Sequence, residues 1–448
     1  MSSSFPNSRR LAITGIGLVT PFGEGADIAW RAVQRGASQV RRLELSELLP
    51  FYSGTDQRCD LSSGANSPIN WGTGWVGAPA SFGKGEVSPN PNEQQRESSS
   101  FVEPVVEMAR RAAREAVADA RLQPGGNVDQ ERLGCVIGTS KGGLRSFERL
   151  QSKSLCDHEA ANLWSTFLPE APSRFIARDI GSQGPLLCPV AACATGLVSL
   201  IRGAALLREG VCDVVVAGSS DASLRLSVLA SFRRLGVLAP ASDDPTGDCR
   251  PFDHNRQGFV MGEGAGVLIL ERWDHAIARG APIRAEWIDG LERGDPSGMT
   301  RLDPEATALT RLLGDLLTRS GQRANDIDAV SLHGTGTHQN DLAECRGVRH
   351  VLGQRADVIP AFGFKGGMGH LLGGAGSVEL ALSVLALQDQ IAPPNVNLRH
   401  PDPECPLHFQ GSTPTQRPMR QLLKLSLGFG GHLSAAMIRS VEESGDGC

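Results

Sequence analysis

Short apolar strands alternate with amphipathic helices along most of this chain, and this order limits the folds open to it. In the first half the sequence predicts a helix over 198–209 and strands over 11–19, 133–138, 214–218 and 265–271. In the second half it predicts helices over 305–320 and 377–388, strands over 328–334 and 362–366, and two apolar C-terminal segments, 422–428 and 433–440. Such alternation is typical of layered α/β proteins with buried strands.

The length of 448 residues exceeds the size at which a single hydrophobic core usually stops growing. We therefore expect two packed halves, residues 1–272 and 273–448, with similar strand–helix order. Duplication is an inference from this order alone, since no direct sequence repetition is visible. Residues 51–100 are rich in Gly, Ser, Pro, Asn and Gln, and we expect them to form an insertion on the surface of the first half.

The overall composition argues against several classes of function. A net charge of -5 gives no basic field for nucleic acid, and no stretch approaches the ~20 apolar residues of a membrane span. Arg9 and Arg10 before an apolar segment imitate a secretory signal, but Gly15, Gly17 and Pro21 interrupt that segment, which reads better as a buried strand. The 10 cysteines lack the paired spacing of metal modules. We expect a cytoplasmic protein with no metal site, no nucleic-acid partner and no membrane insertion.

Cys193 has the sequence context of a nucleophile. It lies between a short extended stretch and a predicted helix, where unpaired N–H groups and the positive end of the helix dipole favour a thiolate. The small residues Ala192, Ala194 and Gly196 leave room beside it for a substrate. Buried thiols are common, so Cys193 by itself is equally consistent with an inert core cysteine.

Two histidines strengthen the case for catalysis. His333 follows a predicted strand in L-H-G-T-G-T, and the carboxyl ends of strands are where α/β proteins bind ligands. His370 follows a second short strand and is framed by glycines, with Lys365 before it and Glu379 on the next predicted helix. One such histidine would usually be structural, but two of them together with a helix-start cysteine indicate a catalytic site.

Several long motifs, in one order along nearly the whole chain, resemble the elongating β-ketoacyl-[acyl carrier protein] synthases, which are thiolase-like condensing enzymes. The motifs are residues 13–23, A-A-C-A-T-G around Cys193, residues 213–223, 232–239 and 250–266, H-G-T-G-T from His333, K-x-x-x-G-H-L-L-G-x-A-G-x-x-E from Lys365, and G-F-G-G from Gly428. The resemblance implies an α/β thiolase-like fold of two similar halves in a five-layered αβαβα arrangement. It also implies a homodimer, or a heterodimer with a sister subunit.

The same resemblance implies a role for each site residue. Cys193 would accept an acyl group from acyl carrier protein, and His333 and His370 would promote decarboxylation of malonyl-carrier protein, so that the enolate attacks the Cys193 thioester. The N–H groups of Cys193 and Phe429 would form an oxyanion hole, and Phe429 would also gate the acyl pocket, with Ile137 and Phe232 at or near its lining. Lys365 and Glu379 would be a buried pair that orients His370 and tunes its protonation. Thr335 and Thr337 would bind the phosphopantetheine arm. No tightly bound cofactor is implied, because the phosphopantetheine arm arrives with the substrate.

Two stretches depart from the family pattern. Gly366, Gly367 and Met368 replace a stretch that usually contains Ser or Thr, and His432 and Leu433 follow G-F-G-G in place of Thr-Asn. These changes leave the acyl chain length open, and with it the choice between fatty-acid elongation and a specialised pathway such as polyketide biosynthesis.

Two other functions are compatible with parts of the sequence. A non-elongating partner subunit of a condensing heterodimer would have lost its nucleophile, whereas this chain keeps Cys193. A serine hydrolase is suggested by Ser140, because G-T-S-K-G matches G-x-S-x-G directly after a predicted strand. Neither an oxyanion loop of the HGGG type nor a defined histidine and acid accompanies Ser140 in the sequence.

Overall fold

The computed structural model describes residues 10–48, 74–82, 102–151 and 157–441. The first half contains β1 (Leu11–Thr20), β2 (Gly23–Glu24), α1 (Ala26–Gln34), β3 (Arg41–Leu43), α2 (Leu45–Leu48), β4 (Trp75–Gly77), α4 (Pro104–Asp119), β5 (Leu133–Gly138), α5 (Leu144–Leu150), α6 (Asp157–Phe167), α7 (Ala171–Ile180), β6 (Leu186–Leu187), α8 (Thr195–Arg208), β7 (Val214–Asp221), α9 (Leu226–Arg234), β8 (Gly264–Arg272) and α10 (Trp273–Ala278). The second half contains β9 (Ala285–Gly294), α11 (Thr307–Ser320), β10 (Ala329–Ser331), α12 (His338–Leu352), β11 (Ala361–Phe362), α13 (Lys365–Met368), α14 (Ala375–Asp389), β12 (Ile391–Ala392), β13 (Thr415–Gln416), β14 (Gln421–Gly428) and β15 (His432–Arg439).

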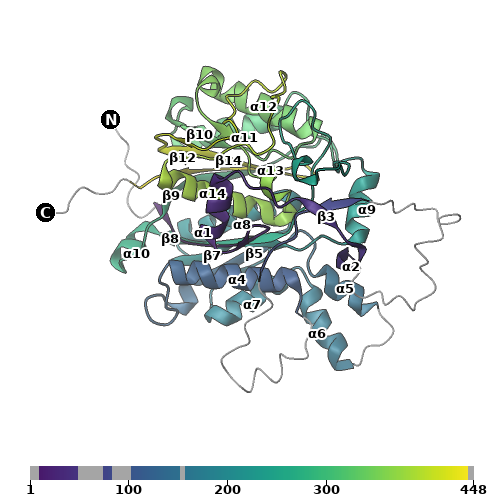
Figure 1. The fold of residues 1–448 in the computed structure, drawn as a ribbon. Helices are drawn as coiled ribbons and strands as arrows, with labels where there is room; N and C mark the ends of the chain where they lie inside the picture. The colour runs from purple at the N-terminus through teal and green to yellow at the C-terminus, as the bar shows by residue number, and fades with distance from the viewer. Residues whose placement is uncertain (1–9, 49–73, 83–101, 152–156, 442–448) are drawn as a thin grey trace, which may run out of the picture.

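These elements stack in five layers (Figure 1). Helices α11 and α12 cover one face of the strands β9, β10, β14 and β15, and α4 and α7 cover the outer face of β1, β5, β7 and β8. Helices α8 and α14 lie between the two groups of strands and contact both. The expected αβαβα arrangement of the thiolase-like fold is confirmed.

The two halves repeat the same strand topology. In the first half β5 pairs in parallel with β6 and β7, β7 pairs antiparallel with β8, and β8 pairs antiparallel with β1. In the second half β10, β11, β14, β15 and β9 repeat these four pairings in the same order. The similar order predicted from sequence therefore corresponds to a structural repeat, while the division near residue 272 stays a prediction as a domain boundary.

The two groups of strands are also joined by hydrogen bonds. Residues 11–13 of β1 pair with residues 285–287 of β9, so that the strands of both halves belong to one 11-stranded sheet. A register shift occurs at Thr14 in β1 and at the equivalent Ile288 in β9. Each half therefore carries one bulge at the same position of its first strand, which bends that strand.

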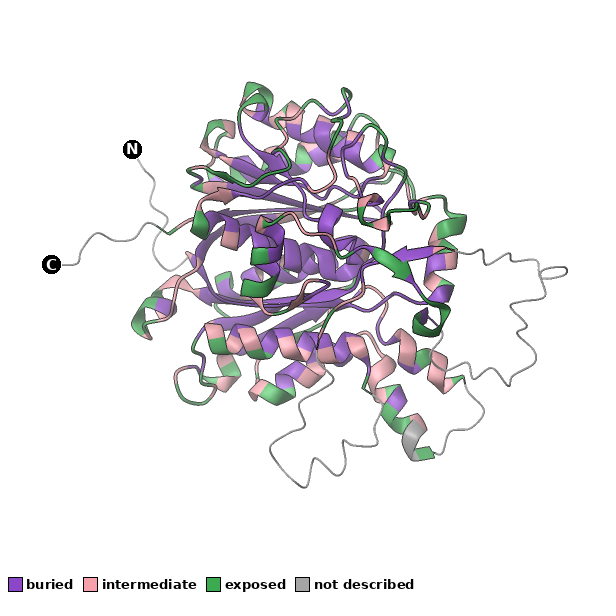
Figure 2. Ribbon diagram, viewed as in Figure 1, coloured by how far each residue is buried: buried purple, intermediate pink, exposed green. Residues whose placement is uncertain are grey.

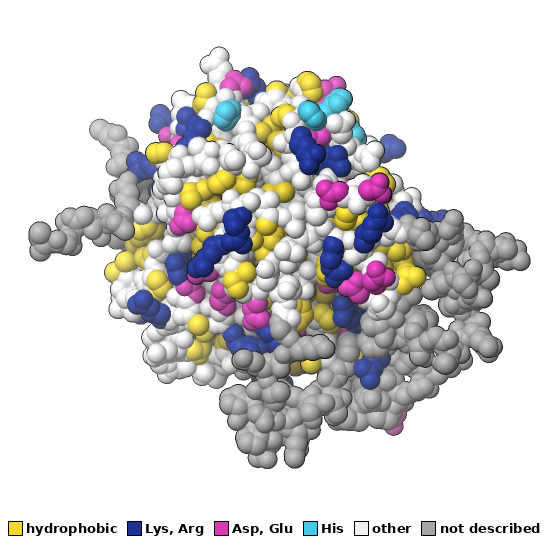
Figure 3. Space-filling model, viewed as in Figure 1, with side chains coloured by type: hydrophobic (Ala, Val, Ile, Leu, Met, Phe, Trp, Pro, Cys, Tyr) yellow, Lys and Arg dark blue, Asp and Glu magenta, His cyan; other side chains and the backbone are white. Residues whose placement is uncertain are grey.

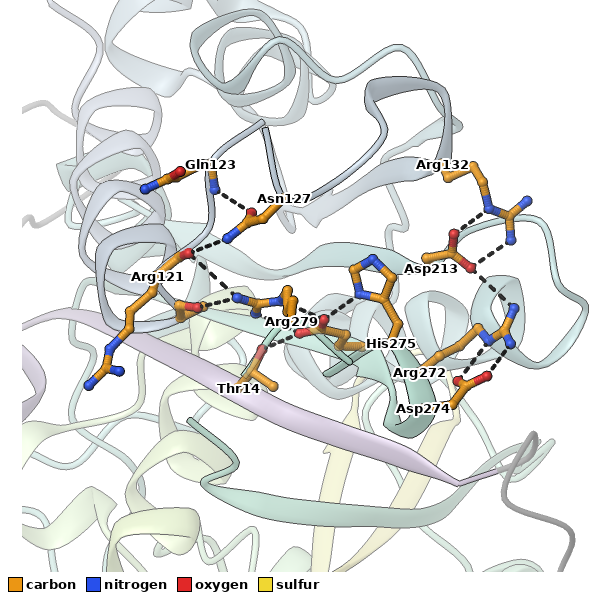
Figure 4. A network of polar contacts seen from close by, with 12 residues as sticks. Thr14, Arg121, Gln123, Asn127, Arg132, Asp213, Arg272, Asp274, His275 and Arg279 are labelled. Atoms are coloured by element: carbon orange, nitrogen blue, oxygen red, sulfur yellow. Dashed lines mark hydrogen bonds and ion pairs between the residues drawn. The ribbon is translucent and has the colours of Figure 1, made fainter. Parts of the chain in front are cut away.

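The polar side chain at the first bulge connects three parts of the first half. The Thr14 hydroxyl donates to the buried carboxylate of Glu271, which also accepts hydrogen bonds from Arg279 (Figure 4). Arg279 donates in turn to the backbone oxygen of Ala120 at the end of α4, at 2.8 Å. This network fixes α4 and α10 against the sheet. Its residues are far from His333 and His370 in the sequence.

Most residues of the central helices are buried (Figure 2). Helix α14 is mostly apolar on all sides, with Ser377, Glu379 and Ser383 as its buried polar residues, and a helix of that composition is stable only when surrounded by protein. It crosses α8 where two glycines meet: a Cβ on Gly196 would lie 2.4 Å from the backbone nitrogen of Ser377, and one on Gly376 would lie 2.5 Å from that of Leu197. Only glycine permits so close an approach of the two backbones.

Three expectations about local structure need correction. Within the predicted surface insertion of residues 51–100, residues 74–82 are described, and β4 pairs there with β3 and buries Trp75 and Val76; residues 51–73 and 83–100 lie outside the described residues. The strand predicted over 362–366 ends at Phe362, and Lys365 already begins α13, because glycines break the strand pattern. Strand β9 and helices α5, α6, α7, α9, α10 and α12 were not predicted.

The surface carries no broad field of one sign on the face seen in Figure 3, where basic and acidic side chains are interspersed. Within the described ranges, no helix is both long enough and apolar enough to cross a membrane.

Candidate active site

One cavity of about 440 Å³ collects most of the residues singled out from the sequence. Both halves contribute to its wall, which includes Cys193, Phe232, His333, Thr335, Thr337, His370 and Phe429. This volume is in the range of small-molecule sites.

Cys193 lies at the start of the central helix α8, as the sequence predicted. It is in a 3-10 turn, residues 192–194, that leads directly into the helix, and Ala192 before it adopts a left-handed conformation with φ of +47°. Such a conformation is uncommon for a residue with a side chain and marks a sharp turn held by its surroundings. The Thr195 hydroxyl accepts a hydrogen bond from the Ala191 N–H at 2.9 Å, which fastens the turn.

The Cys193 thiol is not a thiolate at rest, contrary to the expectation from the helix dipole. Burial raises the pKa of this thiol to about 11, and the positive charges of Lys141 and Lys365 offset only part of that rise. The side chain is 8% exposed, so the low-dielectric surroundings outweigh the favourable charges. The backbone N–H of Phe429 also lowers the pKa of the Cys193 thiol, as a group placed to stabilise negative charge near the sulfur would do.

A glycine allows the Phe429 loop to approach the nucleophile. A Cβ on Gly428 would lie 2.7 Å from the Ala191 oxygen and 3.1 Å from the Cys193 nitrogen. The first glycine of the G-F-G-G motif therefore brings the backbone before Phe429 close to the backbone of Cys193.

The two histidine rings face each other edge to face. Their centroids are 5.2 Å apart with an interplanar angle of 81°, and both side chains are 2% exposed. Burial, together with the charge of Lys365, holds the pKa of His333 and of His370 well below the ordinary value of 6.5. Both imidazoles are therefore neutral at physiological pH.

Hydrogen bonds to Nδ1 set the same orientation for both rings. The Leu372 N–H donates to Nδ1 of His370 at 3.3 Å, and the Lys365 ammonium lies 3.2 Å from Nδ1 of His333. A neutral imidazole that accepts at Nδ1 carries its proton on Nε2. Each histidine can therefore donate a hydrogen bond from Nε2 to a carbonyl oxygen of a substrate.

The Lys365–Glu379 pair exists and acts on both histidines: Lys365 hydrogen-bonds to His333, and only its charge affects the protonation of His370. Lys365 Nζ lies 2.5 Å from Glu379 Oε1 and donates to the backbone oxygen of His333, whereas its contact with His370 is electrostatic only. The reason is that Lys365 begins α13, next to the loop after β10 that carries His333.

A second buried lysine, not identified from the sequence, completes this group. Lys424 Nζ lies 2.6 Å from Glu379 Oε2 and donates to the Leu332 oxygen at 3.1 Å. All three charged side chains are fully buried. A lysine in the middle of the apolar strand L-L-K-L-S-L was the available signal, since an unpaired buried charge is very costly.

Acidic side chains hold the loop after His333. Asp341 accepts hydrogen bonds from the N–H groups of Thr335 and Gly336, and Glu344 accepts from those of His333 and Gly334. Burial raises the pKa of Glu344 to about 7. The hydroxyls of Thr335 and Thr337, which both line the cavity, are 2.9 Å apart.

The two aromatic residues lie as expected, and the aliphatic one does not. The rings of Phe232 and Phe429 are 6.2 Å apart at the cavity wall. Ile137 points instead into the core between β5 and the outer helices, beside Val105, and is absent from the described cavity lining. Its position in a strand buried on both faces explains the error.

Ser140 is placed in a hydrogen-bond network that does not suit a hydrolase. Its hydroxyl donates to the buried carboxylate of Asp221 and lies 2.8 Å from the Lys141 ammonium. Within the described residues no histidine is hydrogen-bonded to Ser140, so the general base of a serine triad is missing there.

Packing explains the two glycines, Gly366 and Gly367, among the departures from the family pattern. A Cβ on Gly366 would lie 2.1 Å from the Val396 oxygen, and one on Gly367 would lie 2.3 Å from the Ala37 oxygen. Met368 is fully buried in the central core, whereas His432 is exposed at the start of β15.

Comparison with known proteins gives a consistent result. The family description "Beta-ketoacyl synthase, N-terminal domain" matches residues 8–276, and "Beta-ketoacyl synthase, C-terminal domain" matches residues 289–399. The chain is 33% identical to the tetracenomycin polyketide synthase ketoacyl synthase alpha subunit of Streptomyces glaucescens, over 97% of this chain and 98% of that protein. It is 32% identical to the 3-oxoacyl-[acyl-carrier-protein] synthase 2 of Rhizobium meliloti, over 96% and 99%.

Solved structures agree with the sequence relatives. A ketosynthase complex with its type II polyketide acyl-carrier protein matches with a TM-score of 0.83 at 27% identity, over 97% of this chain and 100% of that one. The ishigamide ketosynthase/chain length factor matches with a TM-score of 0.79 at 25% identity, over 97% and 99%.

Proposed function

This chain belongs to the β-ketoacyl synthase family of condensing enzymes, which are acyltransferases, and we propose that Cys193, His333 and His370 carry out its reaction. The observation that supports these roles is the meeting of one thiol and two neutral imidazoles in a single cavity. The two substrates are an acyl group and a malonyl group, each delivered on the phosphopantetheine arm of acyl carrier protein.

In the first step the acyl group moves to Cys193. The sulfur attacks the thioester carbonyl, the bond to the pantetheine sulfur breaks, and the departing thiolate takes up the proton that Cys193 loses. The N–H groups of Cys193 and Phe429 hold the oxyanion of the tetrahedral intermediate. Thr335 and Thr337 bind the pantetheine arm from the cavity wall.

In the second step the malonyl group loses carbon dioxide. The Nε2–H groups of His333 and His370 donate to the malonyl thioester oxygen and so stabilise the enolate that remains. The enolate carbon attacks the acyl carbonyl on Cys193, a carbon–carbon bond forms, and the carbon–sulfur bond breaks. The product is a 3-oxoacyl-carrier protein two carbons longer, and Cys193 regains its proton from solvent.

Oligomeric partnership forms a separate part of the proposal. The edge strand β6 exposes Leu186 at 44% and Leu187 at 39%, and the segment between this strand and the Cys193 turn exposes Val190 at 55%. An exposed apolar edge strand is usually covered in the native assembly. We propose that a second subunit covers it, either a copy of this chain or a sister subunit like the one named in the ishigamide ketosynthase/chain length factor.

Two further parts of the proposal are the role of this chain within a pair of subunits and the compartment in which it acts. Retention of Cys193 favours the elongating member of any such pair. The seven described free cysteines suit a reducing compartment, and we propose that the reaction takes place in the cytoplasm.

The proposed function is tested by following the acyl group. Intact-protein mass spectrometry after incubation with a series of acyl-carrier proteins is expected to show one added acyl group on the wild-type chain and none on Cys193→Ala. Cys188→Ala is the matched control, because Cys188 lies five residues away in the same segment and should leave loading unchanged. Acylation of Cys193→Ala at the wild-type rate would refute the assignment.

A further inference from the structure

Lysine is scarce in this chain, and the three lysines that the structure describes lie near the candidate active site. Only five of its 44 basic residues are lysine. The three lysines in the described ranges, Lys141, Lys365 and Lys424, all lie close enough to His370 for their charges to lower its pKa. Lys365 and Lys424 share Glu379. Lys141 has no part in the condensation steps given above.

Lys141 is held by a neutral group rather than by a carboxylate. It follows β5, is half-buried, and its ammonium lies 2.8 Å from the Ser140 hydroxyl, which donates in turn to Asp221. Within the described residues no carboxylate lies at ion-pair distance from Lys141. An ammonium has three N–H bonds, and Ser140 is the one described hydrogen-bond acceptor.

Lys141 is not itself one of the residues that line the cavity, but its ammonium lies near one of them. The Lys141 ammonium lies 5.9 Å from the ring centroid of Phe232, which is part of the cavity wall. Phe232 in turn contacts Phe259, and Phe259 contacts His370. The charge of Lys141 also acts on Cys193, so an acyl group on that sulfur lies within its field.

We propose that Lys141 is a specificity-determining residue, and that its ammonium favours acyl groups with carbonyl oxygens along the chain over plain alkyl chains of equal length. A carbonyl oxygen accepts a hydrogen bond from the ammonium, whereas an alkyl chain would displace water from the charge without replacing it. The inference rests on the proposed acylation of Cys193 and adds a substrate class to it.

The test compares paired substrates in one reaction. Purified protein is incubated with equal amounts of octanoyl-pantetheine and an oxo-octanoyl-pantetheine, with the oxo group at position 3 or 5, and the two acyl forms of Cys193 are measured by mass spectrometry. We expect the wild type to prefer one oxo isomer, and Lys141→Met to reduce that preference roughly tenfold, the effect of one charge-assisted hydrogen bond. Lys141→Arg should retain part of the preference.

Controls separate selectivity from general reactivity. Arg31→Met removes a charge from an exposed position of α1 and should leave the preference unchanged. An equal slowing of both acyl groups in Lys141→Met, with equal slowing of alkylation by iodoacetamide, would overturn the proposal, because Lys141 would then only tune the thiol. Failure of every substrate to acylate wild-type Cys193 would instead overturn the proposed function itself.

Discussion

The two halves of this protein share a scaffold and differ in what they bury within it. Each half has five strands in the same order, a bulge in its first strand, and a central helix that follows a 3-10 turn. The turns match in detail, since Ala192 and Leu372 begin them with φ of +47° and +48°. The register of the paired strands likewise shows which of the remaining residues occupy equivalent positions in the two halves.

The side chains at matched positions are nonetheless different. Cys193 corresponds to Gly373, and Gly138 at the end of β5 corresponds to His333. Glu379 and Lys424 correspond to Ser199 and Ala217. The first half therefore provides Cys193 and has uncharged residues where the second half has His333, Glu379 and Lys424, so that only the histidines have this buried charge network behind them. A common scaffold does not determine where the charges lie.

The largest expected effect comes from removing the shared carboxylate. Glu379→Gln would leave Lys365 and Lys424 fully buried without their counter-ion, and we expect the free energy of unfolding to fall by about 3–5 kcal/mol. Ser199→Ala, the matched change in the first half, removes only a 2.9 Å hydrogen bond to the Thr195 oxygen and should cost about 1 kcal/mol. Urea denaturation of both variants measures the difference, and equal losses would contradict it.

A smaller effect is expected where the halves are alike. Gly196→Ala and Gly376→Ala each push a methyl group into the partner helix backbone, and both should lower the free energy of unfolding by about 1–3 kcal/mol, by similar amounts. Gly314→Ala on α11 is the control, because a Cβ there meets open space and the change should stabilise the helix by about 0.5–1 kcal/mol. A loss confined to one of the two central glycines would show that the helix crossing is not equivalent from its two sides.

The smallest effect concerns the acid side of the pH profile. Because burial and Lys365 hold the pKa of His333 and His370 well below 6.5, both rings stay neutral as the pH falls through 6.5. Decarboxylation of malonyl-pantetheine should therefore keep its rate at that pH and decline only in more acidic solution. Lys365→Met removes one cause of the low pKa, so the decline should begin at a higher pH. An acid limb centred on 6.5 in the wild type would be inconsistent with neutral, buried imidazoles.

Local sequence was sufficient to single out Cys193, His333 and His370 and to predict most of the long strands in order. The two histidines stand next to glycines and Cys193 stands between alanines before a helix, and these are properties of a few consecutive residues. The apolar periodicity likewise predicted most strands within a few residues. It failed for residues 74–82, because the burial of Trp75 depends on a partner strand more than 30 residues earlier in the chain.

Only the tertiary structure decided the electrostatic environment of Cys193, His333 and His370. The sequence placed Cys193 at a helix start and predicted a thiolate, but burial by both halves raises the pKa of the thiol to about 11. Lys424 contacts Glu379, which lies 45 positions earlier in the chain. Lys365 contacts His333 rather than His370, although His370 is nearer to it in sequence. Burial and charge pairing depend on which distant segments of the chain come into contact. A candidate catalytic residue can therefore be identified from its neighbours in sequence, but its protonation state cannot.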